Sequence, residues 1–204
     1  MNLTFKQYRA IDLTIMAVLA AISEAIATIA ASQWFTDQLF VVSTTFAIVC
    51  IVMMRWDGYA VLHAALGGAV YCIVLGASPE QFAVYCVGNC GALAALALFR
   101  LFGKKDVAAK FWVSALYVLA AYLGMELGRW GVSLIVRGAG DGGALGLLVY
   151  FLTTDIITFL FAMLAVMISR KMDGLFEDQR AYLLRVNEEK QKEKEARDKE
   201  NNWY

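Results

Sequence analysis

Four ionisable side chains lie inside long apolar stretches of this 204-residue chain: Glu24, Glu126, Arg129 and Asp155. A charge in hydrocarbon is costly, so it normally pairs with a partner, faces the interior of a helix bundle or lines a polar cavity. Glu126 and Arg129 are three residues apart and can meet on one face of a helix. These four residues are therefore the first candidates for a functional site.

The charges of these residues do not balance. If all four ionise, the set carries a surplus of negative charge, so either one acid is protonated or a cationic ligand or ion completes the balance. Arg129 could then hold an anionic group of a ligand and the acids a cationic one. The competing interpretation is a self-neutralised ion pair that only stabilises packing.

The surrounding sequence predicts the elements that must hold these residues. The chain is 60% hydrophobic, against about 45–50% in soluble domains, and it has a single proline. Its apolar runs are continuous rather than alternating, which favours helices over a membrane barrel. About 20 residues are needed to cross the hydrocarbon core. The predicted spans are residues 12–31, 38–54, 58–76, 80–101, 110–136 and 144–170.

Lys and Arg residues are distributed unevenly over the connections between these spans. The excess on one side predicts that both termini are cytoplasmic. The expected fold class is therefore an all-α membrane protein, a six-transmembrane-helix bundle that crosses the cell membrane several times. We assign residues 1–171 to a transmembrane substrate-binding domain and residues 172–204 to a charged cytoplasmic tail, partly helical or disordered. The N-terminal segment lacks a cleavable signal pattern, so the first span is expected to be retained.

Polar and aromatic residues accompany the charges at similar depth. At about 1.5 Å of rise per residue, Asn89 and the ionisable groups lie about 10 to 18 Å from a span end, on four different helices. Aromatic walls with a few hydrogen-bonding groups are typical of a small-molecule pocket. We expect Trp34 and the glycine-rich segment 137–146 to close over it. The predicted substrate-binding residues are Trp34, Tyr85, Asn89, Tyr122, Glu126, Arg129, Trp130, Tyr150 and Asp155.

Motifs for other chemistry are missing from the sequence. There is no phosphate loop, nucleophile elbow or zinc-protease signature, so we expect no enzymatic activity, no metal, no cofactor and no nucleic-acid partner. The four cysteines form no CxxC pair and suit packing. Gly67, Gly68, Gly124 and Gly128 are expected to let helices of the bundle approach closely.

Two further patterns point to a family. Ala17, Ala21 and Ala25 recur every four residues on one face of the first span, and residues 87–100 read VGNCGALAALALFR, with a Gly-Asn followed by small residues. Together with the length and the six predicted helices, these patterns resemble the S-components of energy-coupling factor (ECF) transporters. The resemblance covers roughly residues 10–171. Glu24 and the long charged tail depart from the family pattern.

The resemblance implies a substrate-capture subunit of an ATP-driven importer. Such a subunit binds a vitamin or related micronutrient in an outward-facing cavity of its last three helices. It would deliver the ligand by docking on a coupling transmembrane subunit that carries two ABC-type ATPases. Ala17 and Ala21 would lie at that interface. The subunit itself would be surrounded by membrane lipid. The alternatives are an ion- or proton-coupled secondary carrier that uses Glu24, Glu126 and Asp155, or a membrane scaffold acting through the charged tail. A secondary carrier would need an inverted repeat or broken helices, and the sequence shows neither.

Overall fold

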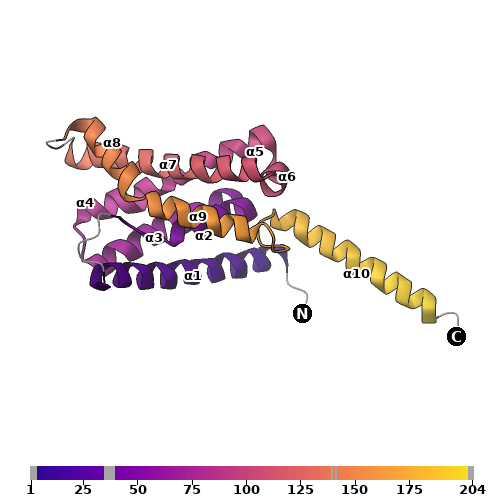
Figure 1. Cartoon of the computed structure of the whole chain (residues 1–204). Coiled ribbons are helices and arrows are strands. Elements are labelled where there is room, and N and C mark those ends of the chain that lie inside the picture. The colour runs from indigo at the N-terminus through magenta and orange to yellow at the C-terminus, as the bar shows by residue number, and fades with distance from the viewer. Residues whose placement is uncertain (1–3, 35–39, 139, 141, 202–204) are drawn as a thin grey trace.

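The structure is a computed structural model that describes residues 4–34, 40–138, 140 and 142–201 of the chain. Within these ranges the regular structure is helical, without strands. Most helices form one bundle, and one charged helix projects from it (Figure 1). The elements in chain order are α1 (Phe5–Trp34), α2 (Thr45–Trp56), η1 (Asp57–Tyr59), α3 (Ala60–Leu75), α4 (Pro79–Phe82), η2 (Ala83–Val87), η3 (Asn89–Leu96), α5 (Ala97–Phe102), α6 (Lys104–Ala109), α7 (Phe111–Arg137), α8 (Gly143–Thr154), α9 (Ile156–Ser169) and α10 (Gln179–Asn201).

Four helical stretches of the described chain are long and apolar enough to cross a membrane, judged by length and composition. They are α1, the stretch from α2 to α3, the stretch from α4 to α5, and α7. The pair α8 and α9 passes the same test together and would make a fifth, although the two helices are bent by 44°. An all-helical protein with several helices long and apolar enough to span a membrane is therefore confirmed for the described residues, whereas six crossings and the side of each terminus stay predictions.

The chain folds back on itself between α2 and α3. At the turn, Asp57 has a positive φ of 54°. A Cβ added to Gly67 of α3 would overlap the side chain of Thr45, at the start of α2. In one straight helix these two residues would be about 33 Å apart. α2 and α3 are therefore antiparallel neighbours, and Gly67 has the packing role that the sequence predicted.

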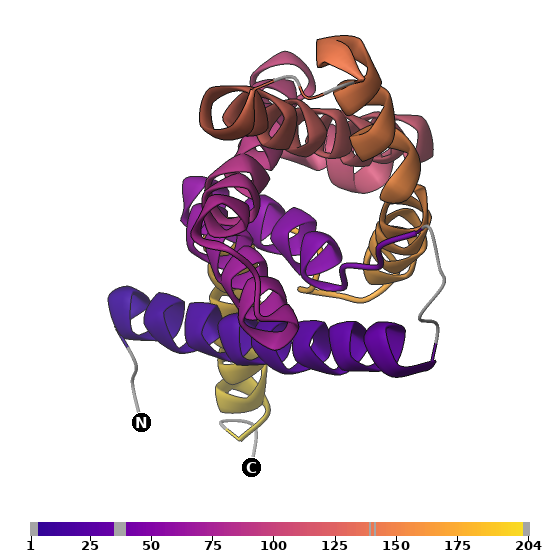
Figure 2. The ribbon, with the colours of Figure 1, turned by 90° about the vertical axis from the view of Figure 1, so that its left-hand side faces the viewer.

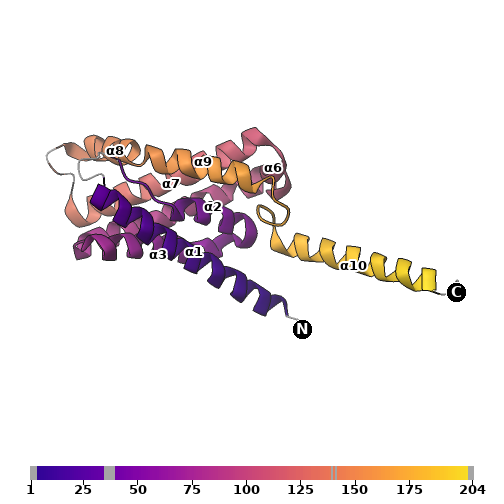
Figure 3. The same ribbon diagram turned by 60° about the horizontal axis from the view of Figure 1, so that its bottom comes forward.

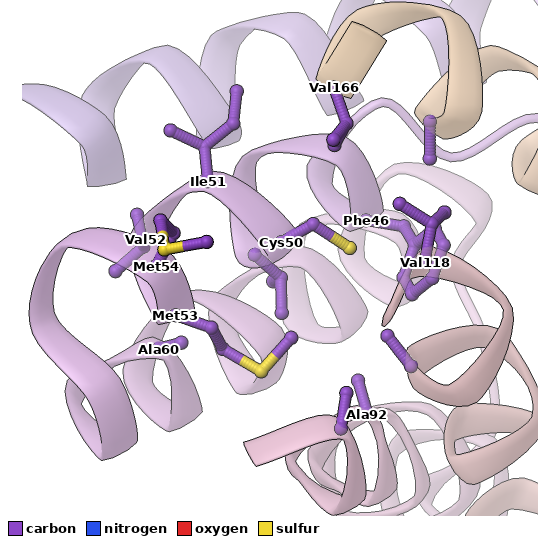
Figure 4. Packing of buried hydrophobic residues seen from close by; sticks show 14 of the residues in the cluster. Phe46, Cys50, Ile51, Val52, Met53, Met54, Ala60, Ala92, Val118 and Val166 are labelled. Atoms are coloured by element: carbon purple, nitrogen blue, oxygen red, sulfur yellow. The ribbon is translucent and has the colours of Figure 1, made fainter. Parts of the chain in front are cut away.

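α2 forms the centre of the core. Every residue of α2 except Ile48 is buried. Figure 2 shows α2 enclosed between α1, α3 and α9, and Figure 4 shows Phe46 and Cys50 of α2 close to Val118 of α7 and Val166 of α9. A helix that is apolar on all faces is expected to be enclosed in this way. The predicted span 38–54 was wrong in its extent, because the helix begins at Thr45 and residues 40–44 are not helical. Residues 38 and 39 of that span lie outside the described ranges.

The extended segment before α2 is tied to the junction of α8 and α9. The N–H of Val41 donates to the carbonyl of Thr154 at 2.8 Å. The hydroxyl of Thr158 donates to the carbonyl of Val41 at 3.1 Å and accepts from the N–H of Ser43 at 2.9 Å. Backbone polar groups inside a membrane-embedded bundle need protein partners. The junction supplies them for this segment.

The predicted continuous span 144–170 is also wrong, because it breaks at Asp155 between α8 and α9. The side chains just before the break give a reason. The hydroxyl of Thr153 donates to the carbonyl of Val149, and that of Thr154 donates to the carbonyl of Tyr150, both within the preceding turn. Such side-chain bonds compete with regular helical bonding and often bend helices.

The stretch from η2 to η3 touches α7 through glycine backbone. A Cβ added to Gly91 would overlap the carbonyl of Gly124, and one added to Gly128 would overlap the carbonyl of Gly88. Without lipid-driven attraction between apolar helices, such close approach is what stabilises a pair. The predicted packing role of Gly124 and Gly128 is confirmed, and Gly68 likewise leaves room for the Tyr85 backbone.

The C-terminal helix α10 points away from the bundle, and α1 crosses the other helices obliquely (Figure 3). The chain between α9 and α10 packs back on the bundle, because Phe176 is buried and its ring lies 6.1 Å from that of Tyr117. The tail predicted for residues 172–204 is therefore helical from Gln179 to Asn201 and is attached at its root.

Candidate functional site

Arg129 of α7 is surrounded by polar and aromatic side chains from other parts of the chain. Its Nη1 donates to a carboxylate oxygen of Asp155 and, at 3.2 Å, to Oε1 of Glu126. Its Nε donates to Oδ1 of Asn89 at 2.7 Å. The guanidinium carbon lies 4.9 Å from the centre of the Tyr85 ring, within range of a cation–π interaction. We call these five residues the arginine site.

Irregular helical geometry presents most of these residues. Tyr85 lies in the π-helical turn η2, Asn89 begins the 3₁₀ segment η3, and Asp155 occupies the break between α8 and α9. The glycine contact supports the arrangement, because a Cβ added to Gly88 would lie 2.6 Å from Cα of Arg129. π-turns are frequent at functional sites. Irregular backbone from two distant parts of the chain, the consecutive η2 and η3 and the break at Asp155, thus converges on one guanidinium.

A second layer of contacts orients the site. The amide nitrogen of Asn89 donates to the carbonyl of Ala64 at 3.3 Å, which leaves its oxygen facing Arg129. The ring of Tyr85 packs on that of Tyr71, with centroids 4.7 Å apart. Both supporting residues belong to α3. α3 therefore holds the two neutral members of the arginine site in place.

The arginine site is buried and its charges are unequal. Glu126 is 0%, Asp155 1% and Arg129 2% exposed. Two carboxylates face one guanidinium, so the site holds one surplus negative charge when both acids are ionised. Oε2 of Glu126 has no hydrogen-bond partner among the described residues. Because an unpartnered buried polar atom is costly, this oxygen is the place where a proton or the donor group of a ligand would be stabilised.

A small cavity lined by described residues adjoins the site. A cavity of about 10 Å³ lies beside Asn89 and Met125. That is room for about one water molecule, whereas ligand pockets usually measure about 300–1,000 Å³. This cavity is too small for a ligand of that size, which would fit beside Asn89 only after neighbouring elements move.

Glu24 does not join the arginine site. Its Oε2 accepts from the N–H of Thr45 at 2.8 Å and from the hydroxyl of Ser43 at 3.0 Å. A carboxylate at this position caps the amino end of α2 and interacts favourably with the helix dipole. Within the described chain Glu24 makes no hydrogen bond or ion pair with Arg129, Glu126 or Asp155, and its similar depth stays a prediction.

Four other predicted residues make no hydrogen bond to Arg129 within the described chain. Tyr122 donates to the carbonyl of Leu152 at 2.6 Å and Trp130 to that of Ala144 at 2.8 Å, so both hold α8 against α7. Tyr150 is 56% exposed. Trp34 is 76% exposed at the end of α1, and residues 139 and 141 of the predicted closing segment lie outside the described ranges.

Ala17 and Ala21 of α1 are half-buried. They lie beside Ala20, which is buried, and beside the exposed side chains of Val18 and Ile22. This places the alanine stripe at the border between the packed and the outward faces of α1. No partner chain is part of the structure, so its interface role stays a prediction.

Sequence reasoning missed a second buried arginine. Arg55, at the end of α2, makes a two-pronged ion pair with Asp12, with Nε and Nη2 donating at 3.0 and 2.6 Å. Its Nη1 donates to the carbonyl of Leu175 at 3.2 Å. Gln179 donates to the carbonyl of Gly174 at 2.8 Å and accepts from the hydroxyl of Tyr8 at 3.0 Å. We call this group the tail-root cluster, because it joins α1 and α2 to the start of α10. Its members lie at span ends, where charged residues are common, so the sequence carried no signal for it.

Comparisons with known proteins give no relative for this chain. It matches no protein-family model, no curated protein and no solved structure.

Proposed function

We propose that this chain is a substrate-capture subunit of a membrane importer and that the arginine site is its ligand-binding centre. The observation that carries the proposal is the convergence of Glu126, Arg129 and Asp155 with a surplus negative charge and one free carboxylate oxygen. Ionisable residues inside membrane helices that face one another usually mark a ligand or ion pathway. A purely structural pair would need only one acid for one arginine.

The site chemistry favours a small polar ligand that carries a protonated nitrogen. The free oxygen of Glu126 would accept a hydrogen bond from that nitrogen and balance its charge. Arg129 and Asn89 would bind an acidic or carbonyl group of the same molecule, and Tyr85 would pack against its flat part. A vitamin or related micronutrient fits this description.

Movement of α8 would open the site. Among its twelve residues only Phe151 is buried, and α8 meets α9 at a bend of 44°. Weakly packed elements next to a hinge are the ones that move most easily. Swinging α8 outward would draw Asp155 away from Arg129, so that a ligand could replace one carboxylate partner.

Six crossings of a bacterial cell membrane with both termini in the cytoplasm suit this role. The antiparallel α2–α3 pair supports counting that stretch as two crossings, the first completed by residues 40–44. The Lys- and Arg-rich connections would then face the cytoplasm. The alanine stripe of α1, at Ala17 and Ala21, would dock on an ECF-type coupling subunit with two ABC-type ATPases. This docking would release the ligand into the cytoplasm.

Native mass spectrometry of the full chain purified from rich medium tests ligand capture. The wild-type protein should carry a small molecule, and Glu126→Gln should lose it because the surplus charge is gone. Tyr150→Phe is the matched control, since this exposed ring lies outside the site and should leave retention unchanged. Ligand-free wild-type protein that also binds none of a panel of cationic vitamins would contradict the proposal.

One observation favours a second function, an ion- or proton-coupled carrier. Such carriers use helices broken at membrane depth, and α8 and α9 break at Asp155. Purified chain in liposomes, without any ATPase, would then move its substrate when a proton gradient is imposed. A capture subunit alone would show binding and no gradient-driven uptake.

A further inference from the structure

A second polar surface lies where α1, the α2–α3 turn and α10 meet, far along the chain from the arginine site. A cavity of about 580 Å³ opens there. Its lining includes the basic residues Arg9, Arg55 and Arg180, the acids Asp57 and Asp178, and the apolar side chain of Leu62. We call this cavity the basic groove.

The acids near the basic groove are already engaged. Asp12 pairs with Arg55, and Asp57 and Asp178 both pair with Lys104, at 2.9 and 2.6 Å. Within the described part of the chain, neither Arg9 nor Arg180 makes an ion pair. Counting Lys104, four cationic side chains lie in or beside the groove against three carboxylates, so Arg9 and Arg180 leave it with a net positive charge that can bind an anion.

Aromatic rings hold both free arginines in place. The guanidinium carbon of Arg9 lies 4.5 Å from the centre of the Tyr59 ring, and that of Arg180 lies 5.3 Å from the centre of the Phe5 ring. A stacked guanidinium keeps its N–H edge free, and this edge matches the oxygens of a phosphate. The two side chains are thus positioned for phosphate rather than merely solvated.

Apolar surface beside the groove indicates the rest of the ligand. Leu62 of α3 is 64% exposed within the groove. On the other side of Arg180 lies an adjoining cavity of about 540 Å³, lined by Phe5, Leu183 and Leu184. A free phosphate would make no use of this surface, whereas acyl chains would cover it.

We propose that the basic groove binds the headgroup phosphate of an anionic phospholipid, with Arg9 and Arg180 as its ligands and the acyl chains on the adjoining apolar surface. Basic pockets between membrane helices are suited to such headgroups. Bound there, the lipid would connect the start of α1 to the root of α10. This inference is independent of the proposed capture function, since it uses no residue of the arginine site.

Native mass spectrometry of the full chain, released from nanodiscs that mix phosphatidylglycerol and phosphatidylcholine, tests the groove. The wild-type protein should retain phosphatidylglycerol preferentially. Each arginine near a membrane surface contributes about 1 kcal/mol to anionic lipid binding, so Arg9→Gln should weaken retention roughly fivefold and the double variant Arg9→Gln/Arg180→Gln roughly thirtyfold. Arg100→Gln is the matched control, because Arg100 is exposed on α5 and does not line the groove.

Three outcomes would overturn the lipid assignment. Equal retention of phosphatidylglycerol by the wild type and the double variant would place the lipid elsewhere. An equal loss in Arg100→Gln would show a general effect of positive charge. If soluble glycerol phosphate displaced phosphatidylglycerol with an affinity equal to that of the lipid, the groove would be a site for a free anion. If the double variant unfolds, the single variant Arg9→Gln, checked by its thermal unfolding, decides the matter.

Discussion

Two buried arginines in this protein have opposite surroundings. Arg55 faces one carboxylate, that of Asp12. The same carboxylate accepts from the indole N–H of Trp56 at 2.5 Å. The remaining guanidinium nitrogen of Arg55 donates to a backbone carbonyl. Arg129 faces two carboxylates, and one oxygen of Glu126 has no partner in the described chain. The charges around Arg55 balance without any added group, whereas those around Arg129 balance only when a positive charge is added.

This difference separates a structural ion pair from a candidate binding site. Buried pairs are held together by full hydrogen bonding, and they become costly when one partner is removed. A buried site with an excess charge is destabilised by that charge until a ligand or a proton neutralises it. Burial and an arginine alone would not distinguish the two, since Arg55 and Arg129 are both nearly inaccessible.

Breaking the complete pair should have the largest effect. Asp12→Asn leaves Arg55 buried without a counter-charge, and we expect a loss of about 3–5 kcal/mol of unfolding free energy. Denaturant unfolding in detergent measures it. Asp106→Asn is the control, because Asp106 and Lys110 form an exposed pair that should contribute less than about 1 kcal/mol. Equal effects of the two substitutions would contradict the structural role of Asp12.

Separating the helices that form the arginine site should have the next largest effect. Gly91→Ala would force the η3 backbone away from Gly124, with an expected cost of about 1–3 kcal/mol from overpacking and weaker ligand retention. Gly131→Ala, on α7 with open space at its Cβ, should instead gain up to about 1 kcal/mol. Thermal unfolding and native mass spectrometry on both variants check this pair. If Gly91→Ala is tolerated like Gly131→Ala, the close backbone contact is not required.

Removing the surplus charge should barely change stability. Glu126→Gln keeps an oxygen that can accept from Arg129 and leaves one acid for one arginine, so we expect a change within about 1 kcal/mol. The same acid-to-amide change at Asp12 should cost several times more. Unfolding curves of the two variants give the comparison directly, and a collapse of Glu126→Gln would mean that both carboxylates are structural.

The smallest effect concerns the attachment of the tail. Burial tends to raise the pKa of Asp178, but the hydrogen bond and charge of Lys104 outweigh it and hold that pKa below its ordinary value, which is about 3.9. The contribution of this pair is therefore present above about pH 4 and is lost as the pH falls through the folded-state pKa. In Lys104→Gln the loss should begin at higher pH.

Cleavage by pepsin near the root of α10, followed across the acid range, measures this shift. The wild-type root should stay protected to lower pH than the variant. Lys105→Gln, which removes a neighbouring exposed lysine without a carboxylate partner in the described chain, is the control. Identical pH profiles for Lys104→Gln and the wild type would show that the Lys104–Asp178 pair does not hold the tail.

Part of this arrangement could be inferred from residue order. The apolar runs and the 60% hydrophobic composition predicted a helical protein with membrane-spanning helices. Depth along the helices predicted that Asn89 and the four ionisable residues Glu24, Glu126, Arg129 and Asp155 lie at similar levels, because the rise per residue is constant. The spacing of Glu126 and Arg129 predicted their contact, because neighbours three apart share a helix face.

Other features depend on which helix ends meet, and no local pattern specifies that. The turn at Asp57 folds α3 against α2, and Glu24 of α1 accepts from Thr45 at the start of α2 rather than from Arg129. The break at Asp155 depends on threonine side chains bonding to their own helix and on the extended segment at Val41, which is more than a hundred residues away in the chain. Burial, ion pairing and the free oxygen of Glu126 follow from these long-range contacts, so only the folded structure could decide them.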